Sequence, residues 1–256
     1  MTAFLYKTYV IAELEVRRLR HDPTELVMRA VQPAFWLLIF GEVFTRVRAI
    51  PTGGLPYLDF MAPGILAQSV LFVAIFSGLA LIWERDLGLV HKLFVSPTPR
   101  AALVTGKAAS AGVRALAQVV IVYTIAMLLG VRMNWHPLAL AGVIAAVLVG
   151  AAGFATLSLI IASLVRSRER FMGIGQVLTM PLFFASNAIY PLAIMPPWLH
   201  AVARVNPLSY EVDALRALMI PDGVSAFGLG LDFALLVGSA VLLVSIAARV
   251  YPRVVR

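Results

Sequence analysis

One polar stretch, residues 83–100, separates two apolar runs that are each long enough to cross a lipid bilayer. The runs cover residues 58–82 and 101–131, and the stretch between them reads WERDLGLVHKLFVSPTPR. Within it, the residues that recur at helical spacing are Asp86, Leu89, Lys92 and Leu93. Two prolines follow and stop the pattern, because proline lacks an N–H and disfavours helix in the residue before it. The sequence therefore predicts a short amphipathic helix over residues 84–96, outside the membrane, between two spanning helices.

The composition supports a membrane protein. Hydrophobic residues make up 61% of the 256 residues, charged residues 13%, and the mean hydropathy is +0.91. Soluble domains average about 45–50% apolar and about 25% charged residues. The net charge of +8 is explained by the Lys and Arg that gather on the cytoplasmic side of membrane proteins, so we expect no nucleic-acid partner. The chain has no Cys, which excludes disulfides and thiolate metal sites within it.

Six apolar runs predict an all-α integral membrane protein with six transmembrane helices, in a single transmembrane domain over residues 1–256. The runs are residues 26–47, 58–82, 101–131, 138–165, 171–190 and 227–248. The fourth is dense in Gly and Ala, which allow close helix packing in lipid. In the third, Lys107 and Arg114 share one face, so its first turns are expected in the cytoplasmic interface. In the first, Arg29 lies near the inner end and Pro33 is expected to kink the helix.

Two segments have helical patterns but are not suited to span the membrane. Residues 3–20 combine an apolar stripe with a charged face, which predicts an N-terminal amphipathic helix in the membrane interface. The charges in these residues, without a compact apolar core, are not typical of a cleavable signal peptide. Residues 191–219 are broken by prolines into two short amphipathic pieces that carry the aromatic residues Trp198 and Tyr210. We predict short outer helices there, re-entrant or lying on the surface, before the last span.

The distribution of basic residues predicts the orientation. With six spans, two-thirds of the 21 Lys and Arg residues lie on the side of the two termini and the central polar stretch. The basic residues on the opposite side are Arg46, Arg48, Arg132, Arg204 and Arg216. By the positive-inside rule we expect a multi-pass protein of the cell membrane with both termini in the cytoplasm.

Two stretches carry a resemblance to a known family. They are WERDLGLVHKLFVSPTPR after the second span and RFMGIGQVLTMPLFFASNAIYPLAIMPPWLHAVARVNPLSYEVDALRAL across the fifth span and the outer segment. With both at these positions in a six-span chain, the sequence resembles membrane permeases of the type-2 ABC exporter family over essentially its whole length. It looks most similar to drug- and lipid-exporting members, including the daunorubicin-type and nodulation-factor-type permeases.

The resemblance implies that residues 84–96 are a coupling helix, which docks into a groove on a separate ATPase subunit. No Walker A pattern is present in the chain, so ATP and Mg²⁺ would be bound by the partner ATPase and this chain would need no cofactor. The implied assembly holds two ATPase subunits and two permeases, the second a copy or a close paralogue. The residues implied to contact the ATPase are Glu84, Arg85, Asp86, Leu89, Lys92, Leu93 and Phe94. From periodicity alone, a solvated loop with ordinary cytoplasmic charges remains the alternative.

Enzymatic activity is not expected. The four His residues lie in separate polar breaks, and their spacing forms no metal site. The ionisable residues near the outer side include Glu42, Asp59, Glu211, Asp213 and Arg216. We expect the first two to be solvated at the interface or paired with Arg46 or Arg48. We expect the last three to form a solvated face of an outer helix, where they could act as a gate.

The predicted function is ATP-driven export of an amphipathic molecule, namely a lipid, a lipid-linked glycan or a hydrophobic drug. The candidate residues along its path are Phe72, Phe76, Met180, Phe183 and Phe184. The alternative for these residues is a packing or lipid-facing role. An ion-coupled secondary transporter of hydrophobic compounds is the second hypothesis, although the predicted span centres hold only Gln68, Gln118, Gln176 and hydroxyl groups. A membrane scaffold is the third.

Overall fold

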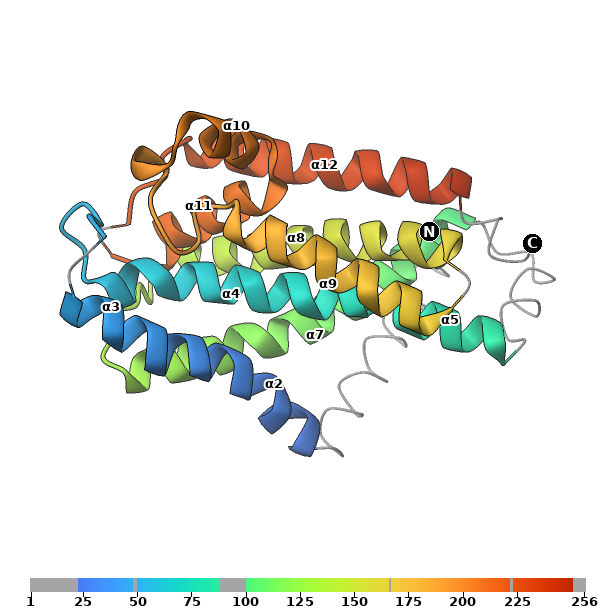
Figure 1. Cartoon of the computed structure of the whole chain (residues 1–256), viewed down its shortest axis with the longest axis horizontal. Coiled ribbons are helices and arrows are strands. Elements are labelled where there is room, and N and C mark those ends of the chain that lie inside the picture. The colour runs from blue at the N-terminus through green and yellow to red at the C-terminus, as the bar shows by residue number, and fades with distance from the viewer. Residues whose placement is uncertain (1–22, 48–49, 88–99, 166, 222, 251–256) are drawn as a thin grey trace.

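The computed structural model describes residues 23–47, 50–87, 100–165, 167–221 and 223–250. In these residues the structure is helical, without strands, and most of the helices run along one long axis (Figure 1). In chain order the elements are α2 (Pro23–Phe35), η1 (Trp36–Gly41), α3 (Glu42–Val47), α4 (Tyr57–Phe76), α5 (Leu79–Asp86), α7 (Arg100–Leu128), α8 (Pro137–Leu164), α9 (Arg168–Phe184), η2 (Leu192–Ile194), α10 (Pro197–Val205), α11 (Pro207–Met219) and α12 (Leu229–Val250). The predicted interfacial helix at residues 3–20 and residues 88–96 of the predicted coupling helix lie outside the described part of the chain.

Five helical segments are long and apolar enough to cross a membrane. They are Met28–Val47, Tyr57–Trp83, Gly106–Leu128, Pro137–Leu164 and Leu229–Val250. Each matches one of the predicted apolar runs. The first contains a π-helical turn, η1, which begins three residues after Pro33. Proline cannot donate a backbone hydrogen bond, and π turns inside α-helices are frequent at functional sites.

The fifth predicted run forms a shorter helix than expected. We predicted a span over residues 171–190, but α9 has 17 residues and ends at Phe184. Its last carbonyl groups are satisfied by a side chain, because Asn206 Nδ2 donates to Leu182 O at 2.7 Å and to Ala185 O at 3.3 Å. The chain then turns toward α10 and α11. Six spans therefore remain a prediction.

Helix α8 is the centre of the bundle, because α4, α7, α11 and α12 all pack against it. Small residues on α8 make this possible, as the sequence predicted. Gly142 contacts Leu218, Gly150 lies directly against the carboxyl group of Glu211, and a Cβ at Gly153 would be 3.7 Å from Ala240 Cβ.

Residues 191–219 form two short helices, α10 and α11, as predicted from their prolines. Helices α10 and α11 lie at one end of the bundle and α5 at the other (Figure 1). Trp198 on α10 is exposed, as expected for an interfacial aromatic residue, whereas Tyr210 on α11 is buried. Helix α11 is enclosed by α4, α8 and α12. It is therefore part of the core and does not lie on the surface.

Candidate functional site

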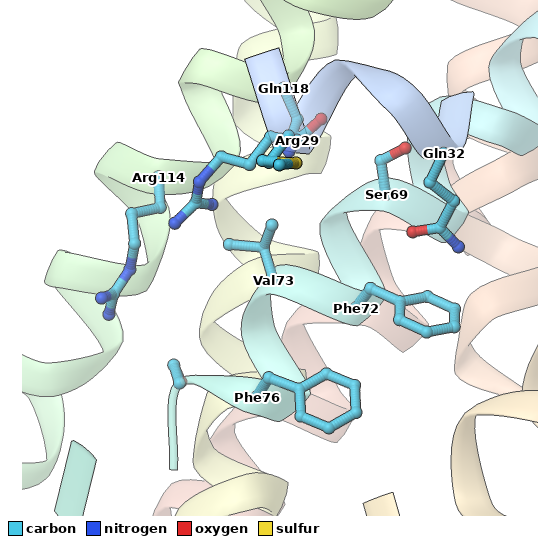
Figure 2. A pocket seen from close by; sticks show the side chains of 10 residues that line it. Arg29, Gln32, Ser69, Phe72, Val73, Phe76, Arg114 and Gln118 are labelled. Atoms are coloured by element: carbon cyan, nitrogen blue, oxygen red, sulfur yellow. The ribbon is translucent and has the colours of Figure 1, made fainter. Parts of the chain in front are cut away.

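A cavity of about 380 Å³ lies between α2, α4 and α7, in the half of α4 that leads into α5. Figure 2 shows it from close by. The residues that line it are Met28, Arg29, Gln32, Ser69, Phe72, Val73, Phe76, Ser77, Arg114 and Gln118. The cavity thus has a polar wall and an aromatic wall, which come from different helices.

The polar wall comes from α2 and α7. Arg29 and Arg114 extend toward the same side of the cavity in Figure 2, with Gln118 beside Arg29. Ser110, Arg114 and Gln118 follow each other at intervals of four residues, so they share one face of α7. Arg114 Nη2 donates to Ser110 Oγ at 3.2 Å, which holds the guanidinium along the helix. Gln118 is 2% exposed, and its Oε1 has no hydrogen-bond partner.

The apolar wall comes from α4. Phe72 and Phe76 are one turn apart, and their rings stack with centroids 6.0 Å apart. They lie on the opposite side of the view from the two guanidinium groups (Figure 2). The structure therefore places two of the five residues predicted along the substrate path in the lining of one cavity.

The other three predicted path residues lie on α9 and do not line this cavity. Phe183 is 1% exposed and packs edge-on against Trp36, with ring centroids 5.6 Å apart. Met180 and Phe184 are 41% and 42% exposed. Packing thus accounts for Phe183, and the outward face of α9 holds the other two.

At the other candidate site, the C-terminal turn of α5 is hydrogen-bonded to the end of α8 and the start of α9. Asp86 Oδ2 accepts hydrogen bonds from Arg168 Nη2 at 2.8 Å and Arg168 Nε at 3.1 Å. The Arg168 guanidinium also lies 3.6 Å from the centroid of the Trp83 ring, and Arg85 Nη1 donates to Val165 O at 2.9 Å. Of the predicted ATPase contacts, Arg85 and Asp86 therefore also have partners inside the chain. Leu89, Lys92, Leu93 and Phe94 lie outside the described residues, as does the side chain of Glu84.

The ionisable residues of α11 are not where the sequence predicted them. Glu211, Asp213 and Arg216 are all buried, so the expected solvated face is wrong. Arg216 donates to Asn187 O at 2.7 Å and lies over the ring of Phe60, 3.8 Å from its centroid. The polar face of α11 is buried because it meets polar partners from other segments of the chain.

Asp213 shows how such burial is compensated. Its carboxylate accepts from Asn187 Nδ2 at 3.3 Å, Ser225 Oγ at 2.8 Å and Phe227 N at 3.0 Å. These bonds satisfy the oxygens that burial removes from water. Glu211 differs, because it is fully buried and neither of its carboxyl oxygens has a partner. Burial raises the pKa of Glu211 well above its ordinary value, so the neutral acid is the favoured form.

The structure agrees with the expectation for Glu42 but not with the expectation for Asp59. Glu42 lies 4.0 Å from Arg46 one helical turn later, which confirms that predicted pairing. Asp59 is buried and its partner is Arg132, from the turn between α7 and α8, at 3.5 Å. The expectation that Asp59 is solvated or pairs with Arg46 or Arg48 is therefore wrong. Within the described residues, no three His, Asp or Glu side chains come close enough to hold a metal ion.

Comparison with known proteins adds independent information. The family model described as ABC-2 type transporter matches residues 6–220. The putative transport permease ycf38 of Cyanophora paradoxa is 28% identical over 218 residues, which are 84% of this chain and 74% of that protein. The daunorubicin resistance ABC transporter permease protein DrrB1 of Streptomyces coeruleorubidus is 24% identical over 233 residues, 91% of this chain and 81% of that protein. Nodulation protein J of Rhizobium leguminosarum bv. trifolii is 28% identical over 170 residues, 66% of this chain and 64% of that protein.

Proposed function

The chain belongs to the ABC-2 type transporter family, and on that premise we propose that it is the permease subunit of an ATP-driven exporter of an amphipathic molecule. Permeases of this family work with ATPase subunits, and the permease itself is a transport subunit without catalytic activity. We propose two ATPase subunits and two permeases per assembly. In this proposal both termini and α5 face the cytoplasm of the cell, and the substrate leaves from the cytoplasm or the inner leaflet.

The cavity between α2, α4 and α7 is the observation that carries the proposed substrate class. Two arginines and an amide form one wall, and the stacked rings of Phe72 and Phe76 form the other. A molecule with a polar head and an apolar body matches both walls, whereas a wholly polar solute would leave the aromatic wall without a partner. Lipids, lipid-linked glycans and hydrophobic drugs all share that division.

The hydrogen bonds between α5 and the start of α9 support the proposed transmission of movement from the ATPase. In the proposal, ATPase closure moves residues 84–96, and α5 transmits the movement to α4 and to α9. The two hydrogen bonds between Asp86 and Arg168 join the beginning of this segment to α9. Two charge-assisted hydrogen bonds from one guanidinium to one carboxylate oxygen hold the two side chains together more firmly than a solvated loop would, so they can transmit displacement.

Reconstitution tests the proposal. The permease and its ATPase, purified together, are placed in vesicles, and ATP-dependent export of a tail-labelled lipid is measured. We expect export to need hydrolysable ATP and the ATPase, and Phe72→Ala with Phe76→Ala to slow export while the complex stays assembled. Trp198→Ala is the control, since Trp198 is exposed on α10 and lies outside the cavity. Export by the permease alone would disprove the assignment.

An ion-coupled transporter remains the second candidate, and one observation favours it. The buried carboxyl of Glu211 lies against Gly150, near the middle of α8, where the sequence had shown only amides and hydroxyls. Buried carboxyl groups carry protons in many ion-coupled transporters. The same vesicles separate the two hypotheses. Ionophores that dissipate proton and sodium gradients should leave ATP-driven export unchanged, whereas an ion-coupled transporter would stop.

A further inference from the structure

Two buried carboxyl groups meet at one serine hydroxyl in the loop between α11 and α12. Ser225 Oγ lies 2.8 Å from Asp213 Oδ2 on α11 and 2.8 Å from Asp232 Oδ2 in the first turn of α12. Asp213 is 1% exposed and Asp232 is 0% exposed. The two carboxyl oxygens are therefore at most 5.6 Å apart, twice the distance of each from Ser225 Oγ.

One of these carboxyl groups must keep a proton, because too few hydrogens are available at the contact. A serine hydroxyl has one hydrogen, so Ser225 can donate to only one of the two. Its oxygen accepts from Gly228 N at 2.6 Å and has a second lone pair, which can accept from a protonated acid. With both carboxyl groups ionised, one oxygen would face Ser225 Oγ at 2.8 Å with no hydrogen between them.

The other hydrogen bonds assign the proton to Asp232. Both oxygens of Asp213 receive further donors, from Asn187 Nδ2 and from Phe227 N, and such bonds favour the ionised form. Asp232 has no donor except Ser225, and its Oδ1 is buried without a partner. An ionised Asp232 would therefore be a buried charge with an unsatisfied oxygen, which is costly.

The surrounding helices supply no cation in place of this proton. Helix α8 packs against α12 and has no ionisable side chain, and the second half of α7 has no basic one. Arg216 on α11 interacts with Asp213 and not with Asp232. Other ionisable side chains around α11 have neighbours of their own: Glu211 faces Gly150 of α8, Asp59 of α4 pairs with Arg132, and Tyr210, which lies near Asp232, donates to Arg204 O of α10.

The loop that contains Ser225 forms part of the wall of a second cavity, of about 380 Å³. Val224 and Ala226 of the loop line it, together with residues 52–55 before α4 and with Asp213. The loop is attached to α11 through Asp213, which accepts from Ser225 Oγ and Phe227 N. Two negative charges at one hydroxyl would repel each other and weaken this attachment.

We propose that Asp213, Ser225 and Asp232 form a proton-binding site that controls this cavity. With one proton bound, the loop over residues 223–228 is held against α11 as part of the cavity wall. Release of the proton at higher pH separates the carboxyl groups and frees the loop. In the proposed exporter this end faces the outside of the cell, so the site would respond to the outer pH. The proton site itself concerns the permease alone and does not depend on the exporter assignment.

Infrared spectroscopy of the purified full-length permease tests for the proton. A protonated carboxyl group has a C=O stretching band that is separate from the bands of carboxylates. Asp232→Asn should remove one such band, which in the wild type should disappear as the pH rises from 5 to 8. Glu211→Gln should remove a different band. Glu42→Gln is the matched control, because Glu42 is 49% exposed, and it should leave the band of Asp232 unchanged.

Hydrogen–deuterium exchange measures the attachment of the loop. The amides of Phe227 and Gly228 donate to Asp213 and Ser225, so their protection reports on these contacts directly. After correction for the intrinsic effect of pH on exchange, we expect their protection in the wild type to fall about tenfold or more from pH 5 to pH 8. That is the effect of losing one hydrogen bond to a charged group. The amide of Leu140, in the first turn of α8, is the reference and should not change.

Two variants separate the proton from a general loss of structure. Asp232→Asn keeps the shape of the protonated acid, and its amide can donate to Ser225, so the loop should stay protected at both pH values. Ser225→Ala removes the shared hydroxyl and should lower the protection at both. Misfolding cannot explain the pair of results, because Asp232→Asn would then lose protection as well.

Three results would overturn the inference. They are a protonated-carboxyl band that persists in Asp232→Asn, protection of the loop that does not depend on pH, and protection at pH 5 that depends on sodium or calcium ions. The last would show that a metal cation, and not a proton, joins the two carboxyl groups. All measurements use the permease without ATPase. Failure of the exporter assignment would therefore leave them unchanged, and their failure would leave the exporter assignment intact.

Discussion

Gly150→Ala tests the contact between α8 and the carboxyl group of Glu211 on α11. A Cβ at Gly150 would clash with the carboxyl group of Glu211: its Oε1 would be only 2.6 Å away and its Cδ and Oε2 closer still, whereas ordinary Cβ contacts begin at 3.4 Å. The carboxyl group would therefore have to retreat by more than 0.8 Å, which is the difference for Oε1 alone. Helix α11, which carries Glu211, is enclosed on several sides, so little space is available for this movement.

The magnitude follows from a comparison with Gly153 on the same helix. There a new Cβ would be 3.7 Å from Ala240 Cβ, an ordinary contact. Both substitutions gain the same helix propensity, about 0.5–1 kcal/mol for Ala over Gly in a helix interior. Only Gly150→Ala also has the cost of overpacking, typically about 1–3 kcal/mol. We therefore expect Gly153→Ala to be neutral or stabilising, and Gly150→Ala to be about 1–3 kcal/mol less stable than Gly153→Ala.

The assay is thermal and denaturant unfolding of the purified variants in one detergent, extended to a double-mutant cycle. Glu211→Ala removes the group that a Cβ at Gly150 would strike, so Gly150→Ala in that background should lose most of its cost. The coupling energy should then be about 1–3 kcal/mol, the range for residues in direct contact. Equal stabilities of Gly150→Ala and Gly153→Ala, or additive effects in the cycle, would refute the placement of Glu211 against α8.

Three further predictions concern charge, force and packing. Glu211→Gln should flatten the pH dependence of stability, because in the wild type the native state keeps a proton that the unfolded chain releases. Above the ordinary Glu pKa the wild type therefore loses up to about 1.4 kcal/mol of stability per pH unit, until the raised pKa of Glu211 is reached. Unfolding of both proteins from pH 5 to pH 8 measures this difference. Asp86→Asn should cost less than about 1 kcal/mol of stability, because the pair with Arg168 is partly exposed. It should nevertheless reduce substrate-stimulated ATP hydrolysis in the reconstituted complex. Unchanged stimulation would show that Asp86 does not transmit movement from the ATPase. Phe183→Ala should destabilise by about 3–5 kcal/mol, because the ring is buried against Trp36; a loss of export at unchanged stability would instead assign Phe183 to the path.

Hydropathy predicted the long helices well, because an apolar run of sufficient length has few alternatives to a helix in lipid. Hydropathy was a poorer guide to burial in α11, where the chain packs back into the bundle. The polar face of α11 has the periodicity of a solvated helix, but Asp213 finds Asn187 and Ser225, which are 26 and 12 residues away in the sequence. An amphipathic pattern shows which residues share a face, but not whether that face meets water or other polar groups.

The cavity could not be predicted from the sequence for a related reason. Arg29, Phe72 and Arg114 belong to three different helices, and only packing brings them to one space. The regular spacing of Ser110, Arg114 and Gln118 was the available signal, since it predicts one polar stripe on an otherwise apolar helix. It did not indicate whether that stripe faces the interface or a cavity.

The position of the cavity along α4 links binding to the proposed source of force. Phe76 is the last residue of α4, and the break at residues 77–78 separates it from α5 by only two positions. The break is held from the side by α8, because Ser158 Oγ accepts from Gly78 N at 3.0 Å and donates to Ile75 O. Gly78 has no room for a side chain there, since a Cβ would meet Ser158 O at 2.9 Å. Helix α5 can therefore not move relative to α8 without moving the end of α4, and with it the aromatic wall. In the proposed exporter, a displacement at residue 84 reaches Phe76, and with it the apolar part of the substrate, over about two helical turns.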